Sequence, residues 1–366
     1  MGKTIQEAFQ RGYNRIHYEV IQKLTMDRRD FIKSSLMGLG ALALSPIPTA
    51  DKISGLTGLG RITTGSISIY KEPWDKSAIL YTRYRDELVN LYAEVKSDKG
   101  PDWNPIWYRV WRGYIHSKFV QTVEKRENPT EASVIKEGQL AEITVPFVQS
   151  MRPRQNEKWE PLYRLYYGSM HWVIDVVEGQ DGTRWYRLQE PWSQLTYDVP
   201  AEAMRFVQNE EFSPISAYVL PEDKRIEVSI SKQELIAFEK DKAVFQAKVS
   251  TGLNHTVPDG EIPWTTPQGE WRISYKMPTQ HMGNGNITSE VEAYELAGIP
   301  WVCYFHPNGN ATHGTFWHSN FGNPMSHGCV NMRSEDARWI FRWSTPVWTP
   351  NDRSVKGNGT RIIVTV

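Results

Sequence analysis

The sequence predicts a mainly β protein with few helices, in which two small β-barrels precede a third β domain. Three observations predict this fold class. Short runs of aromatic and β-branched residues, separated by Gly, Pro and Asp, are typical of strands and turns. Two of these runs recur in the same order, which indicates a duplicated unit. Beyond Pro214, apolar and polar residues alternate, as in Arg225–Ile230, which predicts half-buried strands.

The composition excludes several classes of protein. The 366 residues carry 42 Lys and Arg against 42 Asp and Glu, so no broad basic surface for nucleic acid is expected. A hydrophobic fraction of 40% and a charged fraction of 23% are typical of a chain that folds. The two cysteines, Cys303 and Cys329, exclude a disulfide framework and could supply at most half of a four-ligand zinc site.

Residues 1–60 are predicted to hold a leader and an export signal. The pair Arg28 and Arg29 precedes an uncharged run over residues 34–50, which is short and only weakly apolar for a membrane span. This pattern resembles a bacterial twin-arginine signal, which implies an exported protein of the cell envelope, in the periplasm or the cell wall. An uncleaved signal would also tether the protein to the membrane. A chance Arg pair at a helix start is the alternative, and Met26 is an alternative start.

A repeat in the middle of the chain predicts two similar β units. Residues 80–84 recur as residues 162–166, and residues 107–110 recur as residues 185–188. Both copies resemble the bacterial SH3-like domains that are often attached to cell-wall enzymes. The resemblance implies that they guide substrate and do no chemistry. The predicted boundaries are residues 61–128 for the first SH3-like unit, 138–212 for the second and 220–366 for the C-terminal domain.

Three tryptophans of the first unit, Trp103, Trp107 and Trp111, lie four residues apart. Pro101 and Pro105 argue against a continuous helix there. The tryptophans could form a platform on which a glycan stacks, but buried aromatic residues of a small barrel are the commoner case.

One stretch of the C-terminal region predicts a helix. Ser334–Trp343 has Ser334 as the expected N-cap, with Glu335 and Asp336 in the first turn. The Gly- and Pro-rich residues 252–269 are expected to form a loop over or near a functional site.

The chemistry is expected between His313 and Cys329, where three histidines and one cysteine lie within seventeen residues. A thiol is a good nucleophile only as the thiolate, and a free pKa of about 8.5 means that it needs a nearby base or cation. His313 and His327 are the candidate bases. Gly328 allows a tight turn beside Cys329, so that backbone N–H groups can face a developing oxyanion.

This segment resembles the catalytic motif of L,D-transpeptidases, the cysteine enzymes that remodel peptidoglycan. That motif is a His-Gly-Thr-like element followed by Ser/Thr-His-Gly-Cys, matched here by residues 313–315 and 326–329. The resemblance covers about residues 222–366. It implies an L,D-transpeptidase-type β-sandwich with few helices, placed after the two SH3-like β-barrels.

The resemblance also implies roles. Cys329 would attack a stem-peptide carbonyl next to a terminal D-amino acid, while His313, held by a neighbouring backbone carbonyl, takes the thiol proton. An acceptor amine would resolve the thioester to a cross-link. Peptidoglycan stem peptides are the implied partners, and neither a cofactor nor a metal is implied. The residues expected to orient the site or assist the oxyanion are Ser326, His327, Gly328 and Gly314. The residues expected to bind substrate are Tyr304, Trp317, His318, Asn331 and Arg333.

One position departs from the family pattern. Many L,D-transpeptidases have Arg where this chain has Asn331. If that Arg holds a substrate carboxylate, Asn331, Arg333 or another residue must replace it here.

Three other functions compete with the transpeptidase. Water as the acceptor would make the protein an L,D-carboxypeptidase, and an inactive C-terminal domain would leave a non-catalytic wall-binding protein. A zinc site is the third, although its spacing is not that of standard paired ligands. The zinc candidates are Cys303, His306, His313, His318, His327 and Cys329.

The two thiols are expected to differ. Cys303 lies in an apolar strand pattern and is predicted to be buried and unreactive. Cys329 is predicted to lie in an open cleft beside His313 and to be partly thiolate near neutral pH. Residues 216–366 alone are expected to keep this reactivity.

Overall fold

The computed structural model describes residues 58–153, 158–191, 193–255, 262–283, 288, 290, 295–350 and 352–366. The predicted leader and twin-arginine-type signal cover residues 1–60. All of them except residues 58–60 lie outside the described residues. Within the described part, no helix has the length and apolar character needed to cross a membrane.

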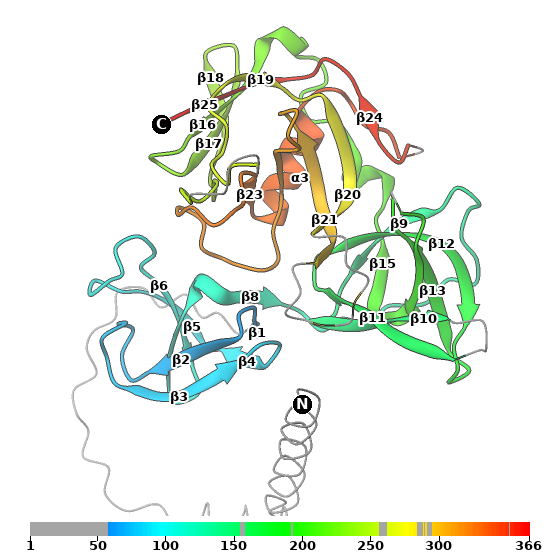
Figure 1. Ribbon diagram of the computed structural model, residues 1–366, viewed down its shortest axis with the longest axis horizontal. Helices are drawn as coiled ribbons and strands as arrows, with labels where there is room; N and C mark the ends of the chain where they lie inside the picture. The colour runs from blue at the N-terminus through cyan, green and yellow to red at the C-terminus, as the bar shows by residue number, and fades with distance from the viewer. Residues whose placement is uncertain are drawn as a thin grey trace, which may run out of the picture. The chain divides into compact units, whose positions relative to one another are not determined.

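The first β unit, residues 58–123, contains two sheets (Figure 1). One has three strands in the order β4-β1-β8, and the other has five in the order β3-β2-β7-β6-β5. Its elements are β1 (Gly58–Ile62), β2 (Ser66–Tyr70), β3 (Ile79–Tyr84), β4 (Leu88–Leu91), β5 (Ala93–Lys96), β6 (Ile106–Val110), β7 (Gly113–His116), the 3-10 helix η1 (Ser117–Phe119) and β8 (Val120–Val123).

The second β unit, residues 139–206, is one seven-stranded sheet in the order β11-β10-β14-β13-β12-β9-β15. The elements are β9 (Gln139–Ile143), β10 (Phe147–Pro153), β11 (Trp159–Tyr166), β12 (Met170–Glu178), β13 (Arg184–Gln189), β14 (Thr196–Pro200), the 3-10 helix η2 (Ala201–Ala203) and β15 (Met204–Phe206). The mainly β prediction therefore holds for both units. Their strand pairing gives open ladders and does not by itself establish closed barrels.

The repeated residues occupy strands in both units. Residues 107–110 lie in β6 and residues 185–188 lie in β13, and in each copy the Tyr is buried, as Tyr108 or Tyr186. The three tryptophans of the first unit differ in burial, because Trp107 has no exposed surface whereas Trp103 and Trp111 are 47% and 65% exposed. Trp107 is therefore a core residue and is not available for a glycan platform.

The C-terminal domain, residues 224–365, has two five-stranded sheets that pack around one helix (Figure 1). Their orders are β18-β17-β16-β25-β19 and β23-β22-β21-β20-β24. Two 3-10 helices, η3 (Asn209–Phe212) and η4 (Pro221–Asp223), precede the domain. Its elements are β16 (Lys224–Ser229), β17 (Glu234–Glu239), β18 (Lys242–Lys248), β19 (Gly269–Arg272), β20 (Tyr275–Gly283), β21 (Glu295–Tyr304), β22 (Ala311–Gly314), β23 (Val330–Met332), α3 (Ser334–Trp343), β24 (Val355–Lys356) and β25 (Arg361–Thr365).

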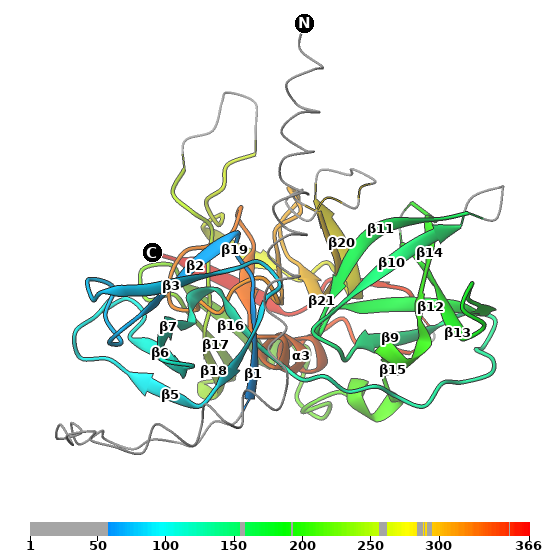
Figure 2. The ribbon, with the colours of Figure 1, turned by 90° about the horizontal axis from the view of Figure 1, so that it is seen from below.

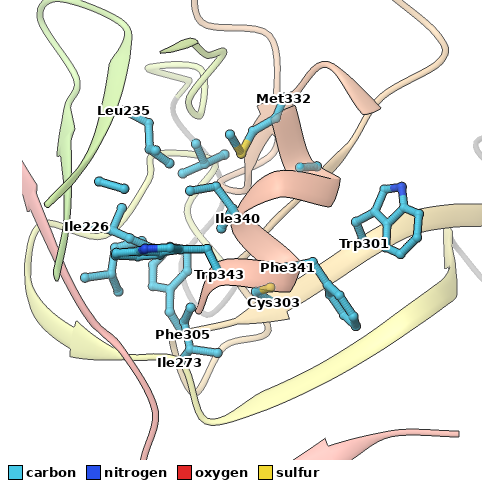
Figure 3. Packing of buried hydrophobic residues seen from close by; sticks show 14 of the residues in the cluster. Ile226, Leu235, Ile273, Trp301, Cys303, Phe305, Met332, Ile340, Phe341 and Trp343 are labelled. Atoms are coloured by element: carbon cyan, nitrogen blue, oxygen red, sulfur yellow. The ribbon is translucent and has the colours of Figure 1, made fainter. Parts of the chain in front are cut away.

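Helix α3 supplies the centre of this core. Ile340 and Trp343 project from the helix among residues of both sheets, including Ile226 of β16 and Cys303 of β21 (Figure 3). The helix spans the predicted residues, but its N-cap is Arg333 rather than Ser334, and no side chain caps it. Acidic residues in the first turn favour the helix through its dipole, as expected.

The core of the C-terminal domain extends into the second β unit. Leu140, Met170 and Trp172 of that unit, at most 5% exposed, belong to the same apolar cluster as Trp301 of β21. Strands β11 and β12 lie beside β20 and β21 in both views (Figures 1 and 2). Part of the core of residues 216–366 is therefore supplied from outside them, and the expectation that these residues alone keep their thiol reactivity stays a prediction.

An ionic cluster reinforces the same contact. His281 of β20 lies between two carboxylates, with Nδ1 3.2 Å from Glu190 Oε1 and Nε2 2.8 Å from Glu295 Oε2. Tyr197 of β14 donates a hydrogen bond of 2.9 Å to Glu190. Burial lowers the pKa of His281, but the hydrogen bonds and charges of Glu190 and Glu295 outweigh it, so the pKa is raised. The second β unit is thus linked to β20 through the His281 imidazole and its two carboxylate partners.

We expect His281→Gln to lower the free energy of unfolding by about 2–4 kcal/mol, because it leaves two buried carboxylates without a cation. A raised pKa in the fold means that the stabilisation is complete below the unfolded pKa of about 6.5 and is lost as pH rises through the folded pKa. Urea unfolding of the wild type and H281Q should therefore differ more at pH 6 than at pH 9. His306→Gln, outside the cluster, is the control. An equal difference at both pH values would contradict the linkage.

Candidate active site

Parallel pairing of β22 with β23 brings the two predicted catalytic residues to one edge of the sheet. The register places Thr312 opposite Val330 and His313 opposite Asn331. Cys329 directly precedes β23 and receives a backbone hydrogen bond from Ala311 of β22. The fifteen residues between His313 and Cys329 therefore return the chain to the same edge of the sheet.

His313 is oriented by a backbone carbonyl. The residue is 2% exposed, and Nδ1 lies 2.9 Å from the carbonyl oxygen of Gly314. Because a carbonyl only accepts, Nδ1 carries the proton and Nε2 is left as the acceptor of neutral imidazole. Burial lowers the pKa of His313 to about 4, partly opposed by the Gly314 hydrogen bond. The imidazole is therefore neutral at pH 7 and able to take a proton.

Cys329 differs from the expectation of a partial thiolate. Its side chain packs against an apolar cluster made of Ile299, Val302, Ala311 and Phe316. This burial raises the pKa of the Cys329 thiol to about 11, although the Ala311 hydrogen bond lowers it somewhat. The resting pair is thus a neutral thiol and a neutral imidazole. An apolar wall disfavours an isolated thiolate, and the sequence motif did not indicate that wall.

The turn before Cys329 depends on Gly328. The φ angle of Gly328 is +112°, and a Cβ atom there would lie 2.4 Å from Asn310 Nδ2. Ser326 closes the turn, because Oγ accepts from Gly328 N–H at 3.1 Å and donates to the Cys329 carbonyl at 2.5 Å. The Gly328 N–H is therefore engaged within the turn by Ser326.

His327 is exposed and faces the loop predicted to lie near the site. Its ring packs edge-on against Trp264 with centroids 4.0 Å apart, and Trp264 also stacks on His255 at 4.4 Å. Gly252 pairs with Ser326 in an isolated bridge. Burial lowers the pKa of His327, as does His255. These contacts place His327 against the 252–269 loop, which gives it a role in holding that loop.

Two expected substrate-binding residues, His318 and Asn331, are buried at 2% and 1% exposure. His318 Nδ1 accepts from Asn320 N–H at 3.2 Å, and Nε2 lies 3.0 Å from Asn331 Nδ2. Burial, followed by the charge of His313, lowers the pKa of His318 to about 3. The two side chains are therefore buried and in contact with each other.

The other three expected substrate-binding residues differ in where they lie relative to Cys329. Tyr304 and Trp317 pack against the same cluster as Cys329, and Trp317 lies 5.7 Å from the His313 ring. Burial, and then Cys329, raise the pKa of Tyr304. Arg333 is exposed over Phe321 and lines a cavity of about 970 Å³ that Cys329 does not line. The structure thus brings Tyr304 and Trp317 to the thiol, and not Arg333.

Sequence reasoning missed three residues that pack against the same apolar cluster as Cys329. They are Tyr166 of the second β unit, Met282 of β20 and Leu296 of β21. Tyr166 belongs to the repeated block, so its strand was predictable, but its counterpart Tyr84 is 58% exposed. Only the fold shows which copy of the repeat reaches the site.

Cys329 thus lies directly before β23, and the carbonyl-oriented imidazole of His313 lies on the paired strand β22. A cysteine nucleophile requires such a base. Residues 223–364 match the L,D-transpeptidase catalytic domain family, YkuD. This part of the chain is therefore an L,D-transpeptidase-family domain, preceded by β units to which no family is assigned. No group of three or more His, Cys, Asp or Glu side chains in the described ranges is placed to hold a metal ion.

Solved structures of L,D-transpeptidases are also similar to this chain. The enzyme from Xylanimonas cellulosilytica is 25% identical, with a TM-score of 0.28, over 39% of this chain and 60% of that chain. A Cys-to-Ser mutant of the Enterococcus faecium enzyme is 18% identical, with a TM-score of 0.29, over 39% and 50%. LdtMt1 in complex with imipenem is 14% identical, with a TM-score of 0.29, over 87% and 100%. The match thus spans 60% and 50% of the first two structures. No functionally curated protein matches the sequence.

Proposed function

We propose that this protein is a peptidoglycan L,D-transpeptidase with Cys329 as the nucleophile and His313 as the base. The observation that carries the proposal is the hydrogen bond of 2.9 Å between His313 Nδ1 and the Gly314 carbonyl, which leaves Nε2 free to accept a proton. The partners are peptidoglycan stem peptides. The location is extracytoplasmic, in the cell envelope, with a membrane tether if the N-terminal signal is retained.

The pKa values define how the first step proceeds. With the pKa of Cys329 raised to about 11 and that of His313 lowered to about 4, the thiol stays protonated until substrate arrives. Cys329 Sγ then attacks the carbonyl that precedes the terminal D-amino acid as its proton passes to His313 Nε2. Since Ser326 holds the Gly328 N–H, the Cys329 N–H is the backbone donor proposed for the oxyanion.

The second half of the reaction restores both groups. Collapse of the tetrahedral adduct breaks the amide C–N bond, and the departing D-amino acid amine takes the proton from the His313 imidazolium. A thioester on Cys329 remains. An acceptor amine from a second stem peptide attacks it, gives its proton to His313 and forms the cross-link, and the thiolate leaves as it regains a proton.

Incubation of purified protein with muropeptide monomers, followed by mass spectrometry, tests the proposal. We expect dimers whose mass equals two monomers minus one D-amino acid, formed by the wild type and by Cys303→Ala. Cys329→Ala should form none, since no other thiol is exposed to the site. Monomers shortened by one D-residue, without dimers, would show that water is the acceptor and the protein is a carboxypeptidase. Binding to sacculi with no mass change in any muropeptide would favour the wall-binding function.

A further inference from the structure

The loop that joins His313 to Cys329 is held from outside by the first β unit. Ser319 donates to two carbonyl groups there, through N to Lys118 at 2.8 Å and through Oγ to Val120 at 3.0 Å. Asn323 Nδ2 donates to the Trp103 carbonyl at 2.8 Å. These contacts join residues about 200 positions apart in the sequence. The first β unit therefore adds hydrogen bonds to those that the loop makes with residues 249–253 of its own domain, and both ends of the loop carry a proposed catalytic residue.

Arg61 of β1 makes the deepest of these contacts. It is 2% exposed, and Nη2 donates to the Phe316 carbonyl at 3.0 Å and to Gln121 Oε1 at 2.8 Å. Nη1 donates to Asp86 Oδ1 at 2.9 Å. Phe316 is three residues beyond His313 and two beyond Gly314, whose carbonyl orients the imidazole. The guanidinium thus fixes the backbone just past the orienting carbonyl.

A continuous series of ring contacts leads from Arg61 to His313. The Arg61 guanidinium lies 4.0 Å from the Tyr166 ring centroid, and Tyr166 lies 5.9 Å from Phe316. Trp317 follows, 5.1 Å from Phe316 and 5.7 Å from His313. Tyr166, Trp317 and Cys329 also pack against the same apolar cluster. Movement of the guanidinium would therefore be transmitted to both proposed catalytic residues.

The Arg61 guanidinium is itself held in place by residues of both β units. Asp86 accepts from Arg61 through Oδ1 and from Arg164 of the second β unit through Oδ2 at 2.7 Å. Gln121 donates through Nε2 to the Tyr167 carbonyl at 2.8 Å, so it also bridges the two units. A buried, multiply bonded guanidinium in a planar fork holds its acceptors at fixed directions, which an ammonium cannot do.

We infer that Arg61 is a positioning residue for the active site, through which the first β unit holds the Gly314–Phe316 backbone and so aims His313 Nε2 at Cys329. This inference rests on the proposed function of His313 as the base. It goes beyond the expectation that the two β units only guide substrate. The first β unit is then part of the catalytic apparatus, although it lies far from His313 and Cys329 in the sequence.

The test compares Arg61→Met and Arg61→Lys in the full chain by iodoacetamide alkylation of Cys329 across pH 5–10. R61M should lower the rate at pH 7.5 by about tenfold to a hundredfold, with a pH profile that approaches that of His313→Gln. R61K keeps the charge beside Tyr166 and Asp86, and should regain part of the rate. Turnover of muropeptides by R61M should fall in kcat with little change in KM.

Arg187→Met is the matched control, because Arg187 also pairs with a buried carboxylate, Asp198, at 2.9 Å but lies within the second β unit. If R61M and R187M both lose thermal stability while keeping the wild-type pH profile of alkylation, Arg61 is merely structural and the inference is wrong. This test and the test of the proposed function can fail independently. A wild type that forms no muropeptide product overturns that function, whereas the alkylation profiles still decide the role of Arg61.

Discussion

Iodoacetamide is expected to label Cys329 in the native protein and to spare Cys303 by roughly a thousandfold or more. Cys303 has no exposed surface and lies inside β21 within the main core, so it can react only when that core opens. Opening a core strand requires a free energy on the order of 5 kcal/mol or more, which leaves very little of the thiol accessible. Cys329 is half-buried at a strand end. Peptide mapping after brief labelling measures the ratio.

The pH dependence of this labelling separates a resting thiol from a resting ion pair. Because burial raises the pKa of Cys329 to about 11, the thiolate fraction and the alkylation rate should increase about tenfold per pH unit from pH 7 to 10. His313 is neutral at all pH values above about 4 and should assist at neutral pH. His313→Gln should therefore slow labelling most near pH 7. In His313→Gln, where no imidazole assists, a rate that is constant from pH 6 to 8 would contradict the raised pKa of Cys329.

Substitution of each thiol completes the comparison. Cys329→Ala should lower turnover by about a thousandfold or more, since no covalent intermediate can form, without unfolding the protein. Cys303→Ala should leave turnover unchanged and lower the free energy of unfolding by about 1 kcal/mol. If Cys303 proves to be the fast-reacting thiol, or if C329A keeps full turnover, Cys329 is not the nucleophile.

The proposed catalytic residues could be selected from the sequence because the features that suggest them are local. Cys329, His313 and Gly328 lie in one short segment, and the demands of a thiol nucleophile are visible in residue types and spacing. The burial of Cys303 follows equally from its strand pattern, and this prediction is confirmed. Local pattern also placed helix α3 correctly, with a difference of one residue at its N-cap.

What surrounds the catalytic residues could not be predicted, because it is non-local. Arg61 reaches Phe316 across 255 residues, and Tyr166 reaches the thiol cluster from another sheet. Tyr84 and Tyr166 occupy equivalent positions of the repeat, yet one is exposed and the other packs near Cys329. The raised pKa of Cys329 follows from burial against Ile299, Val302, Ala311 and Phe316, which the motif does not indicate, so the motif alone gave the opposite expectation.

Residues 216–366, expressed alone, are expected not to hold the native fold. Removing the rest of the chain takes four side chains from the main core, namely Leu140, Met170, Trp172 and Phe212. Losing a large buried side chain typically lowers stability by about 2–5 kcal/mol, and the sum reaches or exceeds the total of about 5–15 kcal/mol that keeps a domain folded. Near-ultraviolet circular dichroism and alkylation of Cys303 report the result, since a molten core exposes that thiol.

The fragment of residues 124–366 is the matched control for this loss. It keeps the four core side chains, Tyr166 and the His281 cluster, and lacks only the first β unit with Arg61. We expect it to fold, to protect Cys303 and to alkylate Cys329 slowly, because the loop after His313 loses its hydrogen bonds to β1 and β8. Full protection of Cys303 and fast labelling of Cys329 in the 216–366 fragment would contradict the shared core. The two fragments together therefore distinguish a β unit that completes the fold from a β unit that completes the active site.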